Sequence, residues 1–191
     1  MGQQFFPRRE AEIASGMVFV DGENLAIRYG NLIAEKSLAV PSHVRFERDT
    51  YVWSVGLNNI CHWGGVRRRH YYTSVQGDVD KITGVVDALK TIGIESPNVF
   101  KKKKTGRSKR VDIQLATDML LHAARKNYDT AVLVAGDEDY VPLVEAVKSE
   151  GRTVLVWFVS DGLSPSLKRS ADHFASFDEV LTQRDINPRW K

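Results

Sequence analysis

The sequence predicts an α/β fold in which helices cover both faces of a mostly parallel sheet. From residue 17 onward, short apolar runs alternate with segments of helical periodicity, which is typical of βα units. The runs at 131–135 and 153–159 are apolar almost throughout, so they indicate strands buried on both faces. The length of 191 residues suits one domain of this kind.

The first elements follow from the residues in order. Residues 17–21 (MVFVD) predict a strand, and residues 23–36 predict a helix that is interrupted near Gly30. Residues 41–50 contain proline and many polar side chains, so we expect a loop there. A second helix is predicted over residues 49–63.

The middle of the chain gives clearer patterns. Residues 66–75 alternate basic and bulky side chains, which favours a strand. Residues 78–93 predict a helix that ends at Gly93 and places its apolar residues on one face: Val79, Ile82, Val85, Val86 and Leu89.

The remaining elements repeat the alternation. Strands are predicted around residues 98–102, 129–136 and 152–159. Helices are predicted at about 111–126, at 139–150 and within 164–174.

Composition bounds the class of protein. With 42% apolar and 27% charged residues, the chain can bury a core, which excludes a fibrous or disordered protein. It has no apolar run of the roughly 18 residues that a membrane span needs, and its first residues lack the apolar part of a signal peptide. Cys61 is the single cysteine, so no intramolecular disulfide can form. We therefore expect a cytoplasmic protein without a membrane partner, with a flexible extension at 1–15, one domain at 16–182 and a tail at 183–191.

A basic segment, residues 101–110, interrupts the domain. It holds seven lysines and arginines and no acidic residue, so the rest of the chain carries a net charge of −4 against the total of +3. Such a segment is either a solvated loop or a surface that faces a polyanion.

Acidic residues follow two of the predicted strands. Asp21 ends the first strand and Asn24 comes three residues later, while Asp137 and Asp139 follow the strand at 129–136. In parallel sheets the carboxyl ends of strands meet at one edge, where ligands bind. Clustered carboxylates repel each other unless a cation neutralises them, so Mg²⁺ or Mn²⁺ is the expected ligand. The alternative is that each acid only caps the helix that follows it.

The helix after the basic segment carries two more acids. Its predicted buried stripe consists of Leu115, Ala116, Met119, Leu120 and Ala123, and Asp112 falls near the centre of that stripe. A carboxylate there is costly unless it is paired, bound to a metal or placed at the helix end. Asp118 lies on the flank of the stripe, as a site residue or as a polar partner of a neighbour.

These motifs resemble the NYN domain, specifically its LabA-like branch. The resemblance covers about residues 17–180 and rests on four segments: 20–24 (VDGEN), 105–120 (TGRSKRVDIQLATDML), 128–154 (YDTAVLVAGDEDYVPLVEAVKSEGRTV) and 164–174 (SPSLKRSADHF). The family commonly has serine where Ala135 stands and phenylalanine where Tyr140 stands. Neither difference removes a carboxylate.

The resemblance implies a Rossmann-like fold similar to that of PIN nucleases, a metal-binding acidic pocket and ribonuclease activity. The pocket that it implies consists of Asp21, Asn24, Asp112, Asp137 and Asp139. Asp118 matches a recurrent acid of the same motif and has a less defined role.

The leading hypothesis is hydrolysis of RNA phosphodiester bonds that depends on Mg²⁺ or Mn²⁺. The aspartates would hold one or two ions, and Asn24 would position the water or the scissile phosphate. The basic segment would bind the backbone of single-stranded RNA through Lys101, Lys102, Lys103, Lys104, Arg107, Lys109 and Arg110. Tyr71, Tyr72 and Trp63 either stack on bases or, as we favour, pack within the protein.

Two other functions stay open. A non-catalytic RNA-binding module would keep the fold and the basic segment but use a metal only for structure. A Toprim-like or phosphatase-like hydrolase is a weaker match, because residues 21–24 (DGEN) lack the DxD motif of such phosphatases and no glutamate ends the first strand. A second copy of the chain or another protein is also an open partner.

Overall fold

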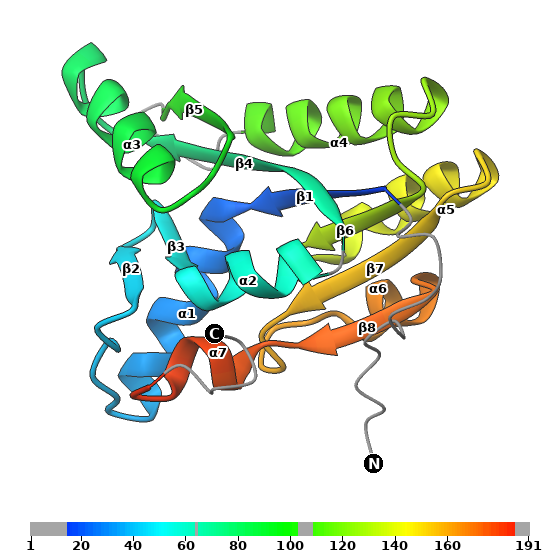
Figure 1. The fold of residues 1–191 in the computed structure, drawn as a ribbon. Helices are drawn as coiled ribbons and strands as arrows, with labels where there is room; N and C mark the ends of the chain where they lie inside the picture. The colour runs from blue at the N-terminus through cyan, green and yellow to red at the C-terminus, as the bar shows by residue number, and fades with distance from the viewer. Residues whose placement is uncertain (1–14, 64, 103–108, 186–191) are drawn as a thin grey trace.

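The core of the protein is a six-stranded sheet in which every neighbouring pair of strands is parallel (Figure 1). The computed structural model describes residues 15–63, 65–102 and 109–185. In spatial order the strands are β5 (Ser96–Lys101), β4 (Val66–Val75), β1 (Gly16–Asp21), β6 (Thr130–Val134), β7 (Thr153–Phe158) and β8 (His173–Ser176). The predicted fold class is confirmed.

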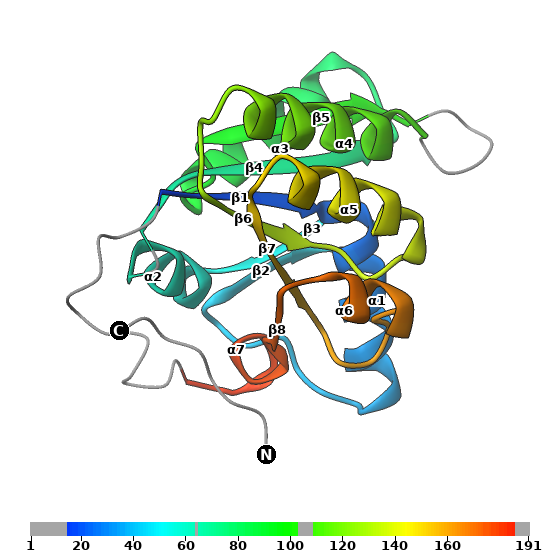
Figure 2. The ribbon, with the colours of Figure 1, turned by 90° about the vertical axis from the view of Figure 1, so that its right-hand side faces the viewer.

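Helices cover both faces of the sheet (Figures 1 and 2). One face carries α1 (Gly22–Glu35), α2 (Val55–Trp63), α3 (Val79–Thr91) and α7 (Asp178–Thr182), and the other carries α4 (Lys109–Ala124), α5 (Val141–Ser149) and α6 (Pro165–Ser170). Successive side chains of β1 point to opposite faces of the sheet, so this strand contributes to the core on each face. Val18 and Val20 join the core under α1, whereas Met17 and Phe19 join the core under α4 and α5.

The prediction for residues 41–63 was partly wrong. Two short antiparallel strands, β2 (Val44–Glu47) and β3 (Tyr51–Ser54), precede α2, where a loop and the start of a helix were expected. The reason is tertiary. The Tyr71 hydroxyl accepts a hydrogen bond from the Val52 amide and donates one to the Val52 carbonyl, so β4 holds β3 in an extended conformation.

Two other element boundaries differ from expectation. Helix α1 continues through Gly30, because Leu25, Tyr29 and Leu32 bury one continuous face. The helix expected over residues 164–174 ends at Ser170, and β8 and α7 follow it. The residues of β8 are mostly exposed, so this strand has no apolar alternation to reveal it and is held by pairing with β7.

The order of the strands places a crevice beside β1. From β1 the chain builds outward through β4 and β5, and it then crosses to β6 on the other side of β1. At such a switch point the connections leave in opposite directions, so the carboxyl ends of β1 and β6 are open to a ligand.

The helices in the described part of the chain are all too short or too polar to span a bilayer.

Candidate acidic site at the carboxyl ends of β1 and β6

Asp21 lies at the centre of the acidic site. It ends β1 and caps α1, because its Oδ1 accepts a hydrogen bond from the Asn24 amide at 3.0 Å. Its Oδ2 accepts a hydrogen bond from the Tyr140 hydroxyl at 2.9 Å. Burial raises the pKa of Asp21 to about 7, and the nearby carboxylates of Asp112 and Asp137 contribute to that rise.

Gly22 is required where β1 turns into α1. A Cβ atom at this position would lie 2.0 Å from the Tyr71 Cε1 atom, inside the ring's own volume. Because the Tyr71 hydroxyl is held by Val52, the ring cannot move aside easily. The close approach fixes the first turn of α1, and with it Asp21 and Asn24.

Asn24 connects the two strands that form the site. Its Nδ2 donates a hydrogen bond to Asp137 Oδ2 at 2.8 Å, and its Oδ1 accepts one from the Gly136 amide at 3.2 Å. We expected Asn24 to position water or phosphate. The structure instead engages both ends of its carboxamide within the protein, so that it orients Asp137.

The other acids of the site differ in exposure. Asp137 follows β6 and also faces Arg28, whose Nη2 lies 3.8 Å from its Oδ1. Asp112, in the first turn of α4, is exposed, and its Oδ1 lies 3.4 Å from the Tyr140 hydroxyl. Asp139 is exposed in the short 3₁₀ helix η1 (Glu138–Tyr140). Asp21, Asp112 and Asp137 thus surround the Tyr140 side chain.

The stripe predicted for α4 was displaced. The buried residues are Val111, Leu115, Met119 and Ala123, while Leu120 is 37% exposed. Asp112 therefore lies beside the buried face and not at its centre. The helix starts near residue 109, and its buried face is set by packing against Tyr72 and Val144 rather than by its overall apolar pattern.

Asp118 is not brought to the site. Its carboxylate accepts hydrogen bonds from the Tyr72 hydroxyl and from Gln114 Nε2, both at 2.9 Å. This arrangement matches the alternative of a polar partner. Its proposed role as a metal ligand has no geometric support from these contacts.

A groove runs from the acids between α4 and α5. We call it the α4/α5 groove, and its volume is about 490 Å³. The acidic end consists of Asp112, Asp137, Asp139 and Tyr140, and the walls consist of Ile113, Ala116, Thr117, Leu120, Pro142, Leu143 and Ala146.

The donor chemistry of the site fits a hard divalent cation. Carboxylate oxygens are the ligands that Mg²⁺ and Mn²⁺ prefer, and the pKa of Asp21 is raised mainly by burial and further by the neighbouring carboxylates of Asp112 and Asp137, both of which a bound cation would offset. Within the described ranges, however, no three aspartate, glutamate, histidine or cysteine side chains are arranged to hold an ion. The Tyr140 hydroxyl occupies the space between Asp21 and Asp112.

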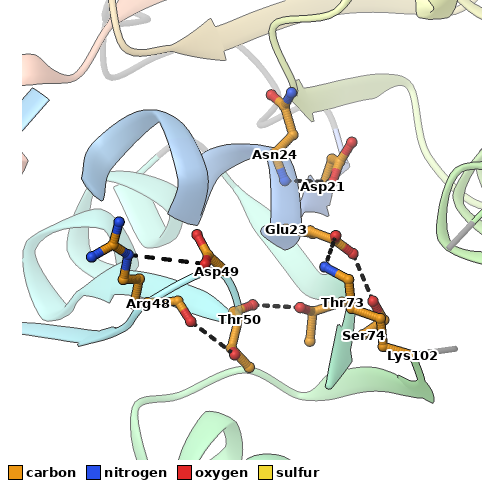
Figure 3. A network of polar contacts seen from close by, with 9 residues as sticks. All are labelled: Asp21, Glu23, Asn24, Arg48, Asp49, Thr50, Thr73, Ser74 and Lys102. Carbon is orange, nitrogen blue, oxygen red and sulfur yellow. Dashed lines mark hydrogen bonds and ion pairs between the residues drawn. The ribbon is translucent and has the colours of Figure 1, made fainter. Parts of the chain in front are cut away.

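The predicted RNA-binding residues have different environments. Lys101 is exposed, and the Arg110 guanidinium lies 4.9 Å from the centre of the Phe100 ring. Lys102 forms an ion pair with the buried carboxylate of Glu23, which also accepts a hydrogen bond from Ser74 Oγ at 2.6 Å (Figure 3). Lys103, Lys104, Arg107 and the side chain of Lys109 lie outside the described residues.

Sequence reasoning missed Glu23 and Arg28. Glu23 stands between two predicted site residues, and its partner Lys102 is 79 positions away. Arg28 is one turn of α1 beyond Asn24, a spacing that does place both on one helix face.

Tyr71 and Tyr72 are fully buried, which confirms packing over base stacking; the side chain of Trp63 lies outside the described part.

Comparison with known proteins gives a family match. The family model of the NYN domain matches residues 16–179. A crystal structure of a Vibrio parahaemolyticus protein of unknown function superposes with a TM-score of 0.62 at 20% identity, covering 88% of this chain and 96% of that one. MurG of Acinetobacter baumannii is more distant, with a TM-score of 0.38 at 11% identity over 85% of this chain and 40% of that chain. No curated protein matches the sequence.

Proposed function

The chain belongs to the NYN domain family, and we propose that it is a divalent-metal-dependent ribonuclease of the LabA-like branch that hydrolyses single-stranded RNA. The NYN domain is a family of PIN-like nucleases, which supports a nuclease-type function at the level of the family. The observation that carries the proposal is the buried Asp21, which lies next to Asp112 and Asp137 at the switch point of the sheet.

In this proposal Asp21, Asp112, Asp137 and Asp139 hold Mg²⁺ or Mn²⁺. The ion supplies two kinds of chemistry, activation of a water for attack on phosphorus and neutralisation of the charge that develops on the phosphate oxygens.

The protein's own groups prepare the site. Asn24 orients Asp137 through its Nδ2, and the Asn24 amide holds one oxygen of Asp21. The Tyr140 hydroxyl donates to Asp21 Oδ2, so a cation held by this carboxylate would compete with it for that oxygen. Arg28 lies at the rim with its side chain 39% exposed, where its guanidinium can bind a phosphate oxygen of the RNA.

Cleavage of end-labelled RNA tests the proposal. Wild-type protein is incubated with single-stranded and structured RNA labelled at either end, in Mn²⁺, Mg²⁺ or EDTA. We expect metal-dependent products, which Asp137→Asn reduces on the order of 100-fold or more, because a neutral amide is a poorer ligand and does not balance the ion's charge.

The matched control is Glu138→Gln. It removes the same charge from an exposed neighbour in η1 that does not line the groove. Products that persist in EDTA, or an equal loss in both variants, would contradict the assigned site.

A non-catalytic RNA-binding module is the second candidate. It is favoured by the lack, in the part of the chain that the structure describes, of three ligands already arranged for a metal. Salt-sensitive binding of RNA without any product would support this candidate over the ribonuclease.

A further inference from the structure

The exposed side of α4 carries a second apolar stripe. Ile113, Ala116 and Leu120 recur at helical spacing on a face distinct from the buried residues of the same helix. Ile113 is 64% exposed and Leu120 is 37% exposed, so both leave apolar surface in contact with water. Core packing therefore does not explain this stripe.

The stripe forms one wall of the α4/α5 groove. Pro142, Leu143 and Ala146 of α5 form the opposite wall, and the groove ends at the carboxylates of Asp112, Asp137 and Asp139. An apolar surface is thus continuous with the acidic site. Its volume of about 490 Å³ lies within the usual range for a site that holds a small organic group.

The charge of the lining indicates which part of a nucleic acid fits. Among the described residues, the groove is lined by apolar side chains, Thr117, Tyr140 and three aspartates, without a lysine or arginine. The uncharged walls offer no counter-charge to a backbone phosphate, whereas an unpaired nucleobase is uncharged and presents flat apolar faces. The Thr117 hydroxyl donates to the Ile113 carbonyl and so remains an acceptor for a base amino group.

We propose that the α4/α5 groove binds one unpaired nucleobase of the RNA strand, beside the phosphate that is cleaved. This inference rests on the proposed ribonuclease function and adds the part of the substrate that the site recognises. Base-paired RNA cannot place a base in the groove, so the groove selects single strands.

Filling the groove tests the proposal. Ala116→Phe introduces a ring between the two walls, and Ala124→Phe, at the exposed end of the same helix, is the matched control. A second pair shortens an apolar side chain. Leu120→Ser removes part of the wall, and Leu121→Ser changes a similarly exposed leucine outside the groove. Circular dichroism checks that each variant is folded.

The substrate is a short single-stranded RNA and a series in which one nucleotide at a time lacks its base. For wild type, we expect loss of one particular base next to the cleavage position to lower kcat/KM about tenfold, as base contacts to proteins typically do. Ala116→Phe and Leu120→Ser should cause a similar loss with intact RNA and show no further loss with the abasic strand. The two control variants should behave like wild type.

Binding of the same strands, measured by fluorescence anisotropy in Ca²⁺, separates the two hypotheses. If wild type cleaves no RNA but its binding depends on the same base and on residues 116 and 120, the groove inference stands and the ribonuclease proposal fails. If cleavage occurs and the groove variants match their controls, the groove inference is overturned. It is also overturned if light scattering shows a dimer that Ala116→Phe dissociates, because a second copy would then cover the groove.

Discussion

Asp21 and Glu23 are buried carboxylates two positions apart that have opposite environments. Figure 3 shows both side chains, together with the partners of Glu23. Glu23 points toward β4 and β5, where Lys102 supplies a cation and Ser74 a hydroxyl. Asp21 points toward Tyr140 and has Asp112 and Asp137 as its charged neighbours. The same short segment thus provides one carboxylate that is paired with a cation and one whose charged neighbours, within the described ranges, are carboxylates.

The difference separates a structural carboxylate from a functional one. A buried ion pair with hydrogen bonds on both partners is tolerated by the fold, and breaking it is costly. A buried carboxylate among other carboxylates lowers stability, and such groups occur mainly where a ligand or a reaction needs them. Glu23 is therefore expected to support the fold, and Asp21 to support activity.

The largest difference between Asp21 and Glu23 is expected in the effect of their substitution on RNA cleavage. We expect Asp21→Asn to lower RNA cleavage on the order of 100-fold or more, because it removes a charge from the proposed metal site. Glu23→Gln should keep cleavage within a few-fold once folded protein is compared at equal concentration. The measurement is kcat/KM in Mn²⁺ below each variant's melting temperature, and equal losses would remove the distinction between the two carboxylates.

Glu23→Gln should lower the stability of the fold, although it leaves activity nearly unchanged. Glu23→Gln leaves the mostly buried ammonium of Lys102 without its counter-charge, and we expect a loss of about 3 kcal/mol in the free energy of unfolding. The control is Glu47→Gln, which breaks the more exposed Glu47–Lys81 pair and should cost much less, because solvent screens that pair. Urea unfolding gives both values, and similar losses would show that the Glu23 pair is no more than a surface contact.

The pH dependence of stability tests the environment of Asp21. Its pKa is about 7 in the folded protein against 3.8 ordinarily, so between these pH values the folded state binds more protons than the unfolded state. The free energy of unfolding should therefore fall as pH rises through this range. Above about pH 7 the ionised Asp21 destabilises the fold by its full amount.

Asp21→Asn does not ionise and should be more stable than wild type by about 2 kcal/mol above that range, but less stable than wild type near pH 4, where Asp21 is protonated and only the lost hydrogen bond counts. The gain is smaller than the pKa shift alone would give, because an amide nitrogen cannot accept the Tyr140 hydrogen bond. Thermal unfolding in EDTA measures it. A gain that is equal at both ends of the range would exclude ionisation as the cause.

The smallest effect is expected at Tyr140. Its hydroxyl donates to Asp21 and lies between Asp21 and Asp112, so a cation held by both carboxylates would have to displace it. We expect Tyr140→Phe to tighten Mn²⁺ binding a few-fold by calorimetry. The control is Tyr29→Phe, which removes a buried hydroxyl that donates to Leu181 O, on the opposite face of the sheet. Weaker binding in Tyr140→Phe would show that the hydroxyl assists the ion.

Much of the fold was predictable because the spacing of apolar residues along the chain indicates which side chains are buried. The apolar runs of β1, β6 and β7 and the period of α3 are visible along the chain, and strand ends predicted Asp21 and Asp137 at one edge of the sheet. The β2–β3 hairpin and β8 were missed, because contacts with Tyr71 and with β7 hold them rather than an apolar pattern of their own.

The amino-acid sequence by itself determined the α/β class, the parallel sheet and the acids at its edge, since each follows from local patterns and from the rule that parallel strands end at the same edge. Only the tertiary structure decided which charges are balanced. In the folded chain Glu23 pairs with Lys102, and Asn24 donates a hydrogen bond to Asp137, which lies 113 positions further along the sequence. Asp118 accepts a hydrogen bond from the Tyr72 hydroxyl. Electrostatic energy depends on distance and burial in three dimensions, and strand order sets both.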